Sequence, residues 1–364
     1  NIGEIPGEAR NYNTEGSVPP QFMSSTLRRP ALGPRVRGLR VKELPRDKLI
    51  SLIYANTLDE FLNILKTTPY SVTIDKLTRE NLDELRKALI KKYIERARSI
   101  YLGVGSDGKP VILASLKYFE YENIRNLINA IRAGKNPEEF ITWEPLEVAK
   151  SRHIIANVLG ARNIWEIGER LKQMKHRAYK AFELASKYGE DKLSIFLDRQ
   201  WIESFLTVLT ASKDRSASMF ASELAEYFNA LIAIRTRVWG FVDEVNELII
   251  GRASPLVLSA IKDPPANFLK NAETTPWGKI LTGIVAETPT LEDIAVAMDN
   301  IYPAYMRKMA DIYITRFTEF SLGALAAIIE YIKAEVLTLI RAASLLAEGV
   351  PLEKRRRIFE ALTR

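Results

Sequence analysis

Asn126–Arg132 reads Asn-Leu-Ile-Asn-Ala-Ile-Arg, and two similar seven-residue stretches occur later in the chain. Asn229–Arg235 reads Asn-Ala-Leu-Ile-Ala-Ile-Arg, and Glu335–Arg341 reads Glu-Val-Leu-Thr-Leu-Ile-Arg, so the copies start 103 and 106 residues apart. A motif that returns at nearly constant spacing indicates an internal repeat. Each copy begins with a polar residue and ends with arginine, so the candidate repeat-motif residues are Asn126, Arg132, Asn229, Arg235, Glu335 and Arg341.

The apolar residues around each copy recur with helical spacing. In the first copy, Ile124, Leu127, Ile128 and Ile131 lie at positions i, i+3, i+4 and i+7, which is one face of a helix. The second copy repeats this face, and the third carries Lys333 in place of its first apolar member. With no convincing strand pattern elsewhere, the sequence predicts an all-α protein built from diverged copies of one helical unit.

A second element recurs at about twice the spacing of the first. Thr67–Tyr70 reads Thr-Thr-Pro-Tyr, and Thr274–Trp277 reads Thr-Thr-Pro-Trp. Proline has no N–H to donate and disfavours the helical conformation in the residue before it, so the sequence predicts that both elements end a helix. The corresponding part of the middle repeat, Lys175–Tyr179, keeps only an aromatic residue, so we expect the middle copy to be the most altered.

The composition sets limits on the class of protein. The 364 residues are 47% hydrophobic, carry a net charge of +7 and include no cysteine, which excludes disulfides and thiolate chemistry. A basic balance is compatible with nucleic acid, an anionic membrane surface or an acidic protein partner. The most apolar stretch, Leu322–Leu346, is interrupted by charged residues and predicts an amphipathic or core helix rather than a membrane span.

The repeat spacing divides the chain into an extension and three helical repeats. The expected boundaries are 1–34 for the extension and 35–150, 151–250 and 251–364 for the repeats. The extension is rich in Gly, Pro, Asn and Ser without periodicity, so we expect it to be extended or disordered until it docks. Deleting Asn1–Pro30 is therefore predicted to leave thermal stability unchanged.

The sequence contains no convincing catalytic, cofactor-binding or metal-binding motif. Gly103–Pro110 has the glycine and lysine spacing of a phosphate-binding loop, but Pro110 stands where a magnesium-binding Ser or Thr is required, and the flanks are helical. A turn between helices is the better interpretation. His153 and His176 lie in different segments and are expected to be structural or surface residues.

Two basic segments are candidate contacts for an acidic partner, although a solvated charged surface is the simpler interpretation. The first lies near the start of the first repeat and the second near the C-terminus. The residues concerned are Arg35, Arg37, Arg40, Lys42, Lys354, Arg355, Arg356 and Arg357.

The order of these motifs resembles the C subunit of archaeal-type (A-type) ATP synthases, the counterpart of the d subunit of the vacuolar ATPase. Arg35-Val36-Arg37, Thr57–Phe61, Leu65–Tyr70 and the motif at Asn126–Arg132 follow one another as in that family. The resemblance runs from about Pro34 to the C-terminus. The first 30 or so residues exceed the family pattern, and the middle repeat lacks the Thr-Pro-aromatic element.

The resemblance implies a funnel of three similar helical domains around a pseudo-threefold axis. In that family the funnel lies on the cytoplasmic face of the membrane rotor ring of a proton- or sodium-translocating complex, as a peripheral subunit. It receives the tip of the central shaft and transmits torque, without an active site, cofactor, metal, nucleic acid or small-molecule substrate. Two alternatives stay open: a basic helical scaffold that binds nucleic acid, which predicts salt-dependent affinity, and an enzyme with a polar pocket between helices.

Overall fold

The computed structural model describes residues 29–364, and none of these residues lies in a strand. The predicted all-α class is therefore confirmed. The first part of the chain forms α2 (Leu32–Val41), α3 (Arg46–Tyr54), α4 (Leu58–Lys66), α5 (Leu82–Tyr101), α6 (Lys109–Leu116), α7 (Tyr118–Arg132), η1 (Pro137–Phe140) and α8 (Trp143–Val148). The middle part forms α9 (Arg152–Val158), α10 (Ile164–Gln173), α11 (Tyr179–Tyr188), η2 (Glu190–Lys192), α12 (Leu193–Ala211), α13 (Arg215–Trp239), η3 (Val242–Glu244) and α14 (Val245–Leu248). The last part forms α15 (Pro255–Lys262), α16 (Pro265–Ala272), α17 (Pro276–Ile284), α18 (Leu291–Phe317), α19 (Leu322–Ala347), α20 (Leu352–Ile358) and α21 (Glu360–Thr363).

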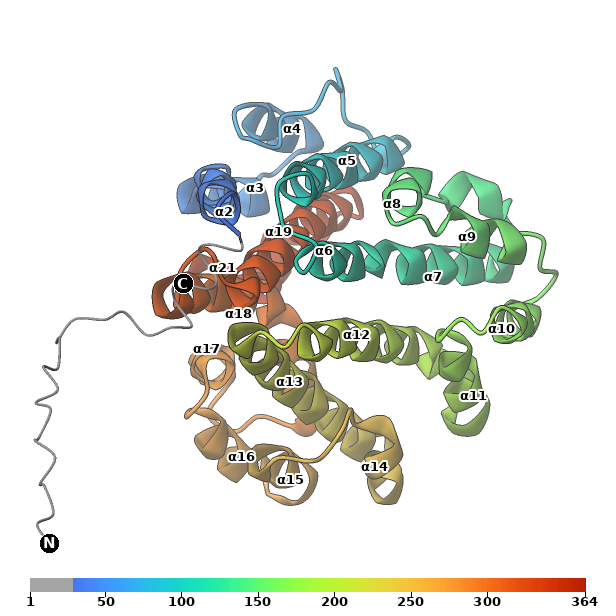
Figure 1. Cartoon of the computed structure of the whole chain (residues 1–364), viewed down its shortest axis with the longest axis vertical. Coiled ribbons are helices and arrows are strands. Elements are labelled where there is room, and N and C mark those ends of the chain that lie inside the picture. The colour runs from blue at the N-terminus through green and yellow to red at the C-terminus, as the bar shows by residue number, and fades with distance from the viewer. Residues whose placement is uncertain (1–28) are drawn as a thin grey trace, which may run out of the picture.

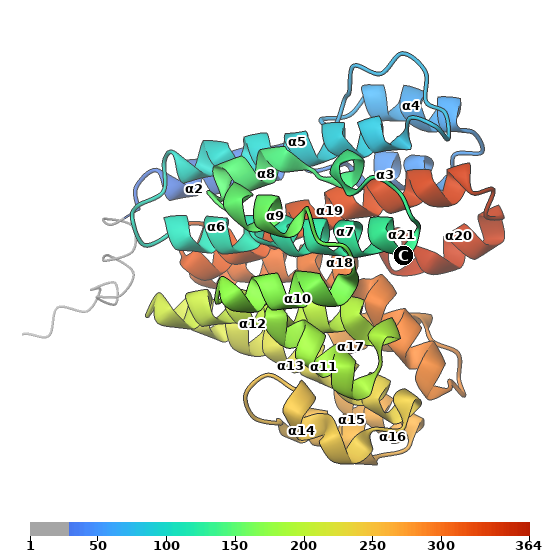
Figure 2. The ribbon, with the colours of Figure 1, turned by 90° about the vertical axis from the view of Figure 1, so that its right-hand side faces the viewer.

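Three helical hairpins built from the longest helices organise the molecule. They are α5 with α6 and α7, α12 with α13, and α18 with α19, and each has a short turn at its tip: residues 102–108, 212–214 and 318–321. Figure 2 shows the α5–α6 turn and the end of α12 on the same side of the molecule. From that side, α7, α13 and α19 run in different directions, so the hairpins diverge away from their tips (Figure 1).

One arginine joins the three hairpin tips. Arg29 is 5% exposed, and its guanidinium lies 2.6 Å from Asp107 in the first tip and 2.9 Å from Asp214 in the second. The same guanidinium donates to the carbonyl of Phe320 in the third tip at 3.3 Å. We call this contact the tip clamp. It joins the three hairpins at one end of the molecule.

The tip clamp corrects the predicted boundary of the N-terminal extension. Arg29 and Leu32 are buried, and α2 begins at Leu32, so residues 29–34 belong to the folded unit. The expectation for residues 1–28 lies outside the described residues. Deleting Asn1–Pro30 would remove Arg29 and leave the partly buried Asp214 without this partner, so from the structure we expect a loss of stability for a deletion that extends this far.

α19 is the central helix of the core. It packs against α2, α3, α4, α5, α6, α13 and α18. Its sequence is apolar nearly all round and rich in alanine, and a helix of that kind is stable only when its whole circumference is covered. The prediction of a core helix at Leu322–Leu346 is confirmed. No helix within residues 29–364 combines the length and the apolar character that a membrane crossing requires.

The two Thr-Thr-Pro-aromatic elements have the same local hydrogen bonds but different relations to their helices. Thr68 and Thr275 each donate from Oγ1 to the carbonyl three residues earlier, at 2.7 and 2.8 Å. Pro69 follows the end of α4, as predicted, whereas Pro276 is the first residue of α17 with Thr275 as its N-cap. Proline at this position is favourable because the first N–H of a helix has no intrahelical partner. The prediction that both elements end a helix is confirmed, because α16 ends at Ala272 just before the second element. Pro276 in addition begins the next helix, which the sequence did not predict.

Candidate functional site

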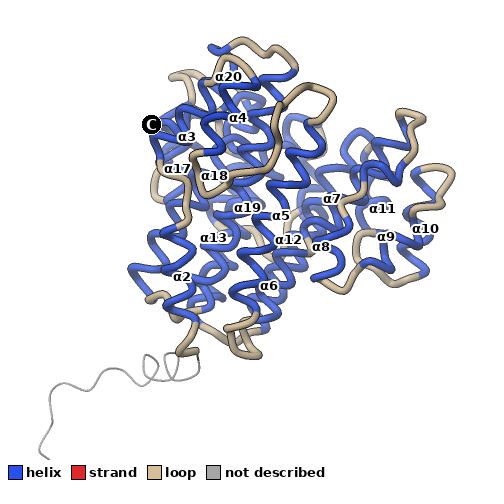
Figure 3. Tube along the Cα trace, turned by 90° about the horizontal axis from the view of Figure 1, so that it is seen from above, coloured by secondary structure: helices blue, strands red, loops and turns tan. Residues whose placement is uncertain are grey.

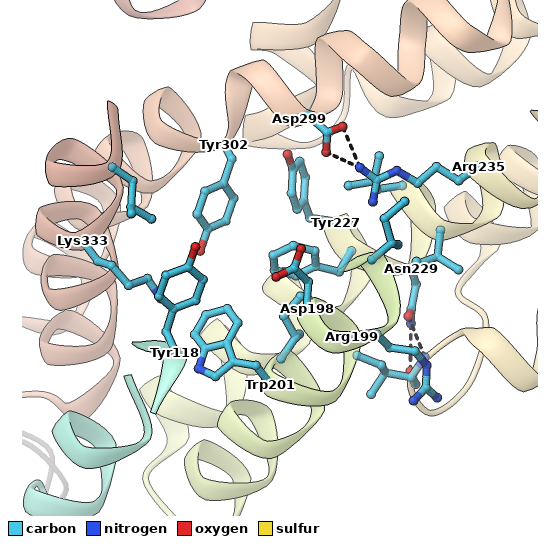
Figure 4. A pocket seen from close by; sticks show the side chains of 17 residues that line it. Tyr118, Asp198, Arg199, Trp201, Tyr227, Asn229, Arg235, Asp299, Tyr302 and Lys333 are labelled. Atoms are coloured by element: carbon cyan, nitrogen blue, oxygen red, sulfur yellow. Dashed lines mark hydrogen bonds and ion pairs between the residues drawn. The ribbon is translucent and has the colours of Figure 1, made fainter. Parts of the chain in front are cut away.

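A cavity of about 200 Å³ lies where the three hairpins meet, and we call it the central cavity. Figure 4 shows its lining side chains, which come from α7, α12, α13, α18 and α19. The walls are mainly aromatic and aliphatic. The lining includes Tyr118, Asp198, Trp201, Tyr227, Asn229, Arg235, Asp299, Tyr302, Lys333 and Leu337.

A buried ion pair joins the wall of the cavity to the protein core. The Nζ of Lys333 lies 2.5 Å from Oε2 of Glu330, and the two side chains are 1% and 0% exposed. The same ammonium lies 3.7 Å from the ring centre of Trp201 and 4.7 Å from that of Tyr118. A cation over two aromatic faces gains attraction from the ring quadrupoles, and this attraction is strongest where water is excluded.

Glu330 connects this ion pair to α6 and α18. Its carboxylate accepts hydrogen bonds from Ser115 at 2.5 Å and from Tyr302 at 3.2 Å, and Ser115 is itself 2.8 Å from the hydroxyl of Tyr93. Ser115 belongs to the first hairpin, Trp201 to the second and Tyr302 to the third. The network around Glu330 and Lys333 therefore includes side chains from all three hairpins. Breaking one member of such a network is costly because a charged or polar group is left buried without a partner.

Two more ion pairs lie at the mouth of the cavity. Arg235 of α13 lies 2.6 Å from Asp299 of α18, and Arg125 of α7 pairs with Asp198 of α12. The carboxylate side chains remain 45% and 43% exposed, so both are reachable from solvent. A second hollow, of about 120 Å³, shares Asp299, Tyr302 and Leu337 with the central cavity and extends to Arg341 and Phe359.

The repeat-motif residues occupy different environments. Arg235 and Asn229 line the central cavity, whereas Glu335 is buried on another side of α19 and accepts from Tyr70, Tyr331 and the amide of Leu44. Arg341 is exposed and lies over the ring of Phe359. In the first copy, Asn126 donates to the carbonyl of Phe140 at 3.2 Å and the exposed Arg132 pairs with Glu190.

The asparagine whose backbone hydrogen bonds match those of Asn229 is Asn123, not the predicted Asn126. Asn229 accepts from the amide of Ile250 and donates to its carbonyl, at 2.7 and 2.8 Å. Asn123 does the same with Thr142, at 2.8 and 3.0 Å. Asn123, Asn229 and Glu335 are spaced by 106 residues in both steps, which is a more regular repeat than the one that begins at Asn126.

Nearly the whole described chain is similar to proteins of one known family. Residues 32–358 match the ATP synthase (C/AC39) subunit family. The chain belongs to that family. Two relatives, each described as the C subunit of A-type ATP synthase, come from Pyrococcus abyssi and Methanothermobacter thermautotrophicus. The first is 20% identical over 88% of this chain and 87% of the relative, and the second is 21% identical over 76% and 73%. Family membership makes this chain a structural subunit of an A/V-type ATP synthase rather than an enzyme.

The basic residues predicted to contact a partner fall into three groups in this family member. Arg355 is buried and donates to the carbonyls of Ile53 and Ala55 at 2.8 and 2.9 Å, so it closes α20 onto α3 and is removed from the predicted interface. Some are paired on the surface: Arg37 with Glu319, Arg40 with Glu43 and Asp311, and Arg356 with Glu353. Within the described residues, the ones that make no ion pair are Arg35, Lys42, Lys354 and Arg357.

The motifs that resembled enzyme sites are structural. The residues from Gly103 to Gly108 form a turn between two helices, as predicted, and Lys109 begins α6 with its ammonium 5.2 Å from the ring centre of Tyr101. His153 is exposed, and His176 lies 2.5 Å from the buried carboxylate of Glu120 on α7. Among residues 29–364, no cluster of three or more potential metal ligands is present.

The buried ion pair was missed from the sequence, although α19 carries a signal for it. Lys333 is the charged member of an apolar stripe, and Glu330 lies three residues earlier on the same helix. Residues with this spacing are neighbours on a helix. Two opposite charges three residues apart, inside a helix otherwise too apolar to face water, are typical of a buried pair. The aromatic partners of Lys333 come from other hairpins and could not be predicted from α19.

The ion pair predicts a specific dependence of stability on pH. Burial lowers the pKa of Lys333 from 10.5 to about 8, and the nearby Glu330 opposes that shift. Between these values the unfolded chain binds a proton at Lys333 that the folded chain does not bind. The contribution of this residue to the free energy of unfolding therefore increases as pH rises from 8 to 10.5, by about 3 kcal/mol.

The control is the double variant Glu330→Gln/Lys333→Met, which cannot titrate at this site. Chemical denaturation at several pH values gives the difference in free energy of unfolding between wild type and variant. That difference is expected to be constant from about pH 6.5 to about 8. Above pH 8 the free energy of unfolding of the wild type is expected to rise relative to that of the variant. A difference that stays constant up to pH 10.5 would contradict a lowered pKa for Lys333.

Proposed function

We propose that the chain is the non-catalytic central-stalk rotor subunit of a proton- or sodium-translocating A/V-type ATP synthase. In this role it links the central shaft to the membrane rotor ring, lies on the cytoplasmic face as a peripheral subunit, and transmits torque. The observation that carries the proposal is the central cavity: side chains from all three hairpins meet there, while the tip clamp of Arg29 holds the hairpins together at one end. A partner in this cavity contacts every hairpin at once.

The hydrogen bonds at Asn123, Asn229 and Glu335 support a pseudo-threefold arrangement for this rotor subunit. Thr142 and Ile250, the partners of the two asparagines, lie just before α8 and before α15. Leu44, the partner of Glu335, lies just before α3, near the start of the folded chain. Each unit therefore holds the segment that opens another unit, and the third unit returns to the first. In this arrangement the units begin near residues 44, 142 and 250, whereas the sequence predicted 35, 151 and 251.

The size of the central cavity determines what part of the shaft it can hold. A helix with its side chains is about 10 Å across, so a volume of about 200 Å³ accommodates a few side chains rather than a helix end. The aromatic and aliphatic walls favour aromatic or apolar side chains on the shaft, because the carboxylates of Asp198 and Asp299 already pair with arginines. The hairpins line the cavity unequally, so their contacts with one shaft are expected to be unequal.

The ends of the molecule offer separate surfaces to the two partners. Figure 3 shows α20 with α3 and α4 at one end and the turn before α6 at the other. α20 carries Lys354 and Arg357, which are exposed and are candidates for contact with an acidic partner surface. A joint that bears torque needs slow dissociation, so we expect at least one partner interface of standard size or larger, about 1,600 Å² in total.

The proposal predicts binding to two purified partners. The full chain, mixed with the central-shaft subunits and separately with the detergent-solubilised ring, is expected to form a complex with each on size-exclusion chromatography. Raising the ionic strength weakens the contribution of surface charges, so binding that persists across a wide salt range indicates an extensive interface. Failure to bind either partner, together with binding of nucleic acid at moderate salt, would contradict the rotor function and favour the basic-scaffold alternative.

A further inference from the structure

A hollow of about 440 Å³ lies between α2 and α5, away from the central cavity, and we call it the α2–α5 groove. Its lining includes four basic side chains and one acidic side chain. These residues are Arg35, Lys42, Lys92, Arg96 and Glu95, and the remainder of the wall comes from Gly38, Leu39, Pro69 and Ser99. A concave surface with this excess of positive charge raises the local concentration of anions.

The basic side chains of the groove differ from their neighbours in lacking a carboxylate partner. Arg37 and Arg40 lie on the same helix, and both make ion pairs, with Glu319 and with Asp311. Within residues 29–364, none of Arg35, Lys42, Lys92 and Arg96 makes an ion pair. Within the described residues, the cations beside the groove are therefore paired, whereas those that line it make no direct ion pair and outnumber the one lining carboxylate, Glu95.

One of these cations is held rigidly at the base of the groove. Arg96 is 7% exposed, its Nη1 donates to the hydroxyl of Tyr70 at 2.7 Å, and its guanidinium lies 4.1 Å from the Tyr70 ring centre. The Tyr70 hydroxyl donates in turn to Glu335. A side chain that is already ordered loses little conformational entropy when a ligand binds, which favours affinity.

The other wall of the groove is kept open by a glycine. A Cβ atom added to Gly38 would have no heavy atom within 4 Å, so the space above this residue is empty. Gly38 is exposed on α2, where almost any other residue would be a better helix former. A larger side chain at this position would enter the groove without displacing the fold.

We propose that the α2–α5 groove binds a small ligand that carries phosphate groups, of the size of a phosphorylated sugar or inositol. Arginine binds phosphate through its planar fork, and lysine binds it as a point charge, so both residue types of the groove suit this chemistry. An acidic protein segment fits less well, because interface centres are depleted of lysine and anchored by apolar or aromatic side chains. Here Leu39 is buried and only Pro69 offers exposed apolar surface.

This inference is independent of the rotor function and departs from the expectation that the chain binds no small molecule. It is tested on the full chain by isothermal titration calorimetry with inorganic pyrophosphate and with inositol hexakisphosphate. Lys92→Glu and Gly38→Glu are each expected to lower the affinity about tenfold or more, because each places a negative charge in the groove. Lys91→Glu is the matched control: it has the same charge change on the same helix but does not line the groove.

The pattern across the variants decides the result. A loss of affinity for the phosphate probes in Lys92→Glu and Gly38→Glu, but not in Lys91→Glu, supports the site. Equal affinity in the wild type and all three variants, or an equal loss of affinity in Lys91→Glu, would contradict it. Co-sedimentation with phosphatidylcholine vesicles that contain phosphatidylinositol bisphosphate distinguishes a lipid headgroup from a soluble ligand as the source of phosphate. Groove-dependent binding of polyglutamate without binding of either phosphate probe would overturn the proposal in favour of an acidic protein segment.

Discussion

Replacing Arg29 with methionine is expected to lower the free energy of unfolding by about 3 kcal/mol, because the change leaves Asp214 partly buried without this partner. The change also removes the contacts of this guanidinium with Asp107 and with the carbonyl of Phe320, so the first tip loses its ion pair to the clamp. Asp214 keeps its role as N-cap of α13, accepting from the amides of Ser216 and Ala217, so that helix should still form.

Arg132→Met provides the matched control for this prediction. Arg132 pairs with Glu190, and the two side chains are 41% and 44% exposed, so the pair is solvated and its loss should not be measurable. Urea denaturation of the two variants gives the comparison. Equal stability of Arg29→Met and Arg132→Met would show that the tip clamp does not hold the fold together.

Replacing Glu330 with alanine is expected to cost about 3–5 kcal/mol, at least as much as the loss of Arg29. It leaves the ammonium of Lys333 buried with no opposite charge, and removes the acceptor of the Ser115 and Tyr302 hydrogen bonds. Part of this cost is relieved as Lys333 loses its proton, since burial already lowers its pKa. Stability of the variant should therefore improve as pH rises.

Two further variants separate the ion pair from the packing around it. Glu330→Gln/Lys333→Met removes both charges and keeps similar volumes, and buried pairs replaced in this way are often neutral in stability. Glu353→Ala breaks an ion pair of the same i, i+3 spacing with Arg356, but on the surface, and should have no measurable effect. If Glu330→Ala proves as mild as Glu353→Ala, the ion pair is not buried as described.

Local sequence patterns predicted the helices well, because helix formation and burial of one face depend on neighbours a few residues apart. The all-α class and the helix at Leu322–Leu346, predicted as amphipathic or core and found in the core, both follow from such patterns. The element at Thr274–Trp277 follows the end of α16 as predicted, but the start of α17 at Pro276 was not predicted, because a proline suits both the residues after a helix and the first residue of the next one.

The candidate site depends on contacts between distant residues, which periodicity does not encode. Arg29 looked like part of a polar extension, yet its partners are 78 and 185 residues away. Arg355 looked like one of four equivalent basic residues, yet it alone is buried against the end of α3. The recurring motif was visible in the sequence, but the register of its first copy was ambiguous, because Asn123 and Asn126 both precede helical leucine and isoleucine residues.

Cross-linking in the assembled ATP synthase tests most directly whether the central cavity receives the shaft. The chain contains no cysteine, so a single introduced cysteine is unique in it. Asp198→Cys and Asp299→Cys place a thiol at the cavity mouth, and Leu258→Cys, at a residue that is 43% exposed on α15, is the control. We predict that a thiol-reactive photo-cross-linker joins the two cavity variants, but not Leu258→Cys, to a shaft subunit. Cross-links from Leu258→Cys with none from either cavity variant would contradict the account.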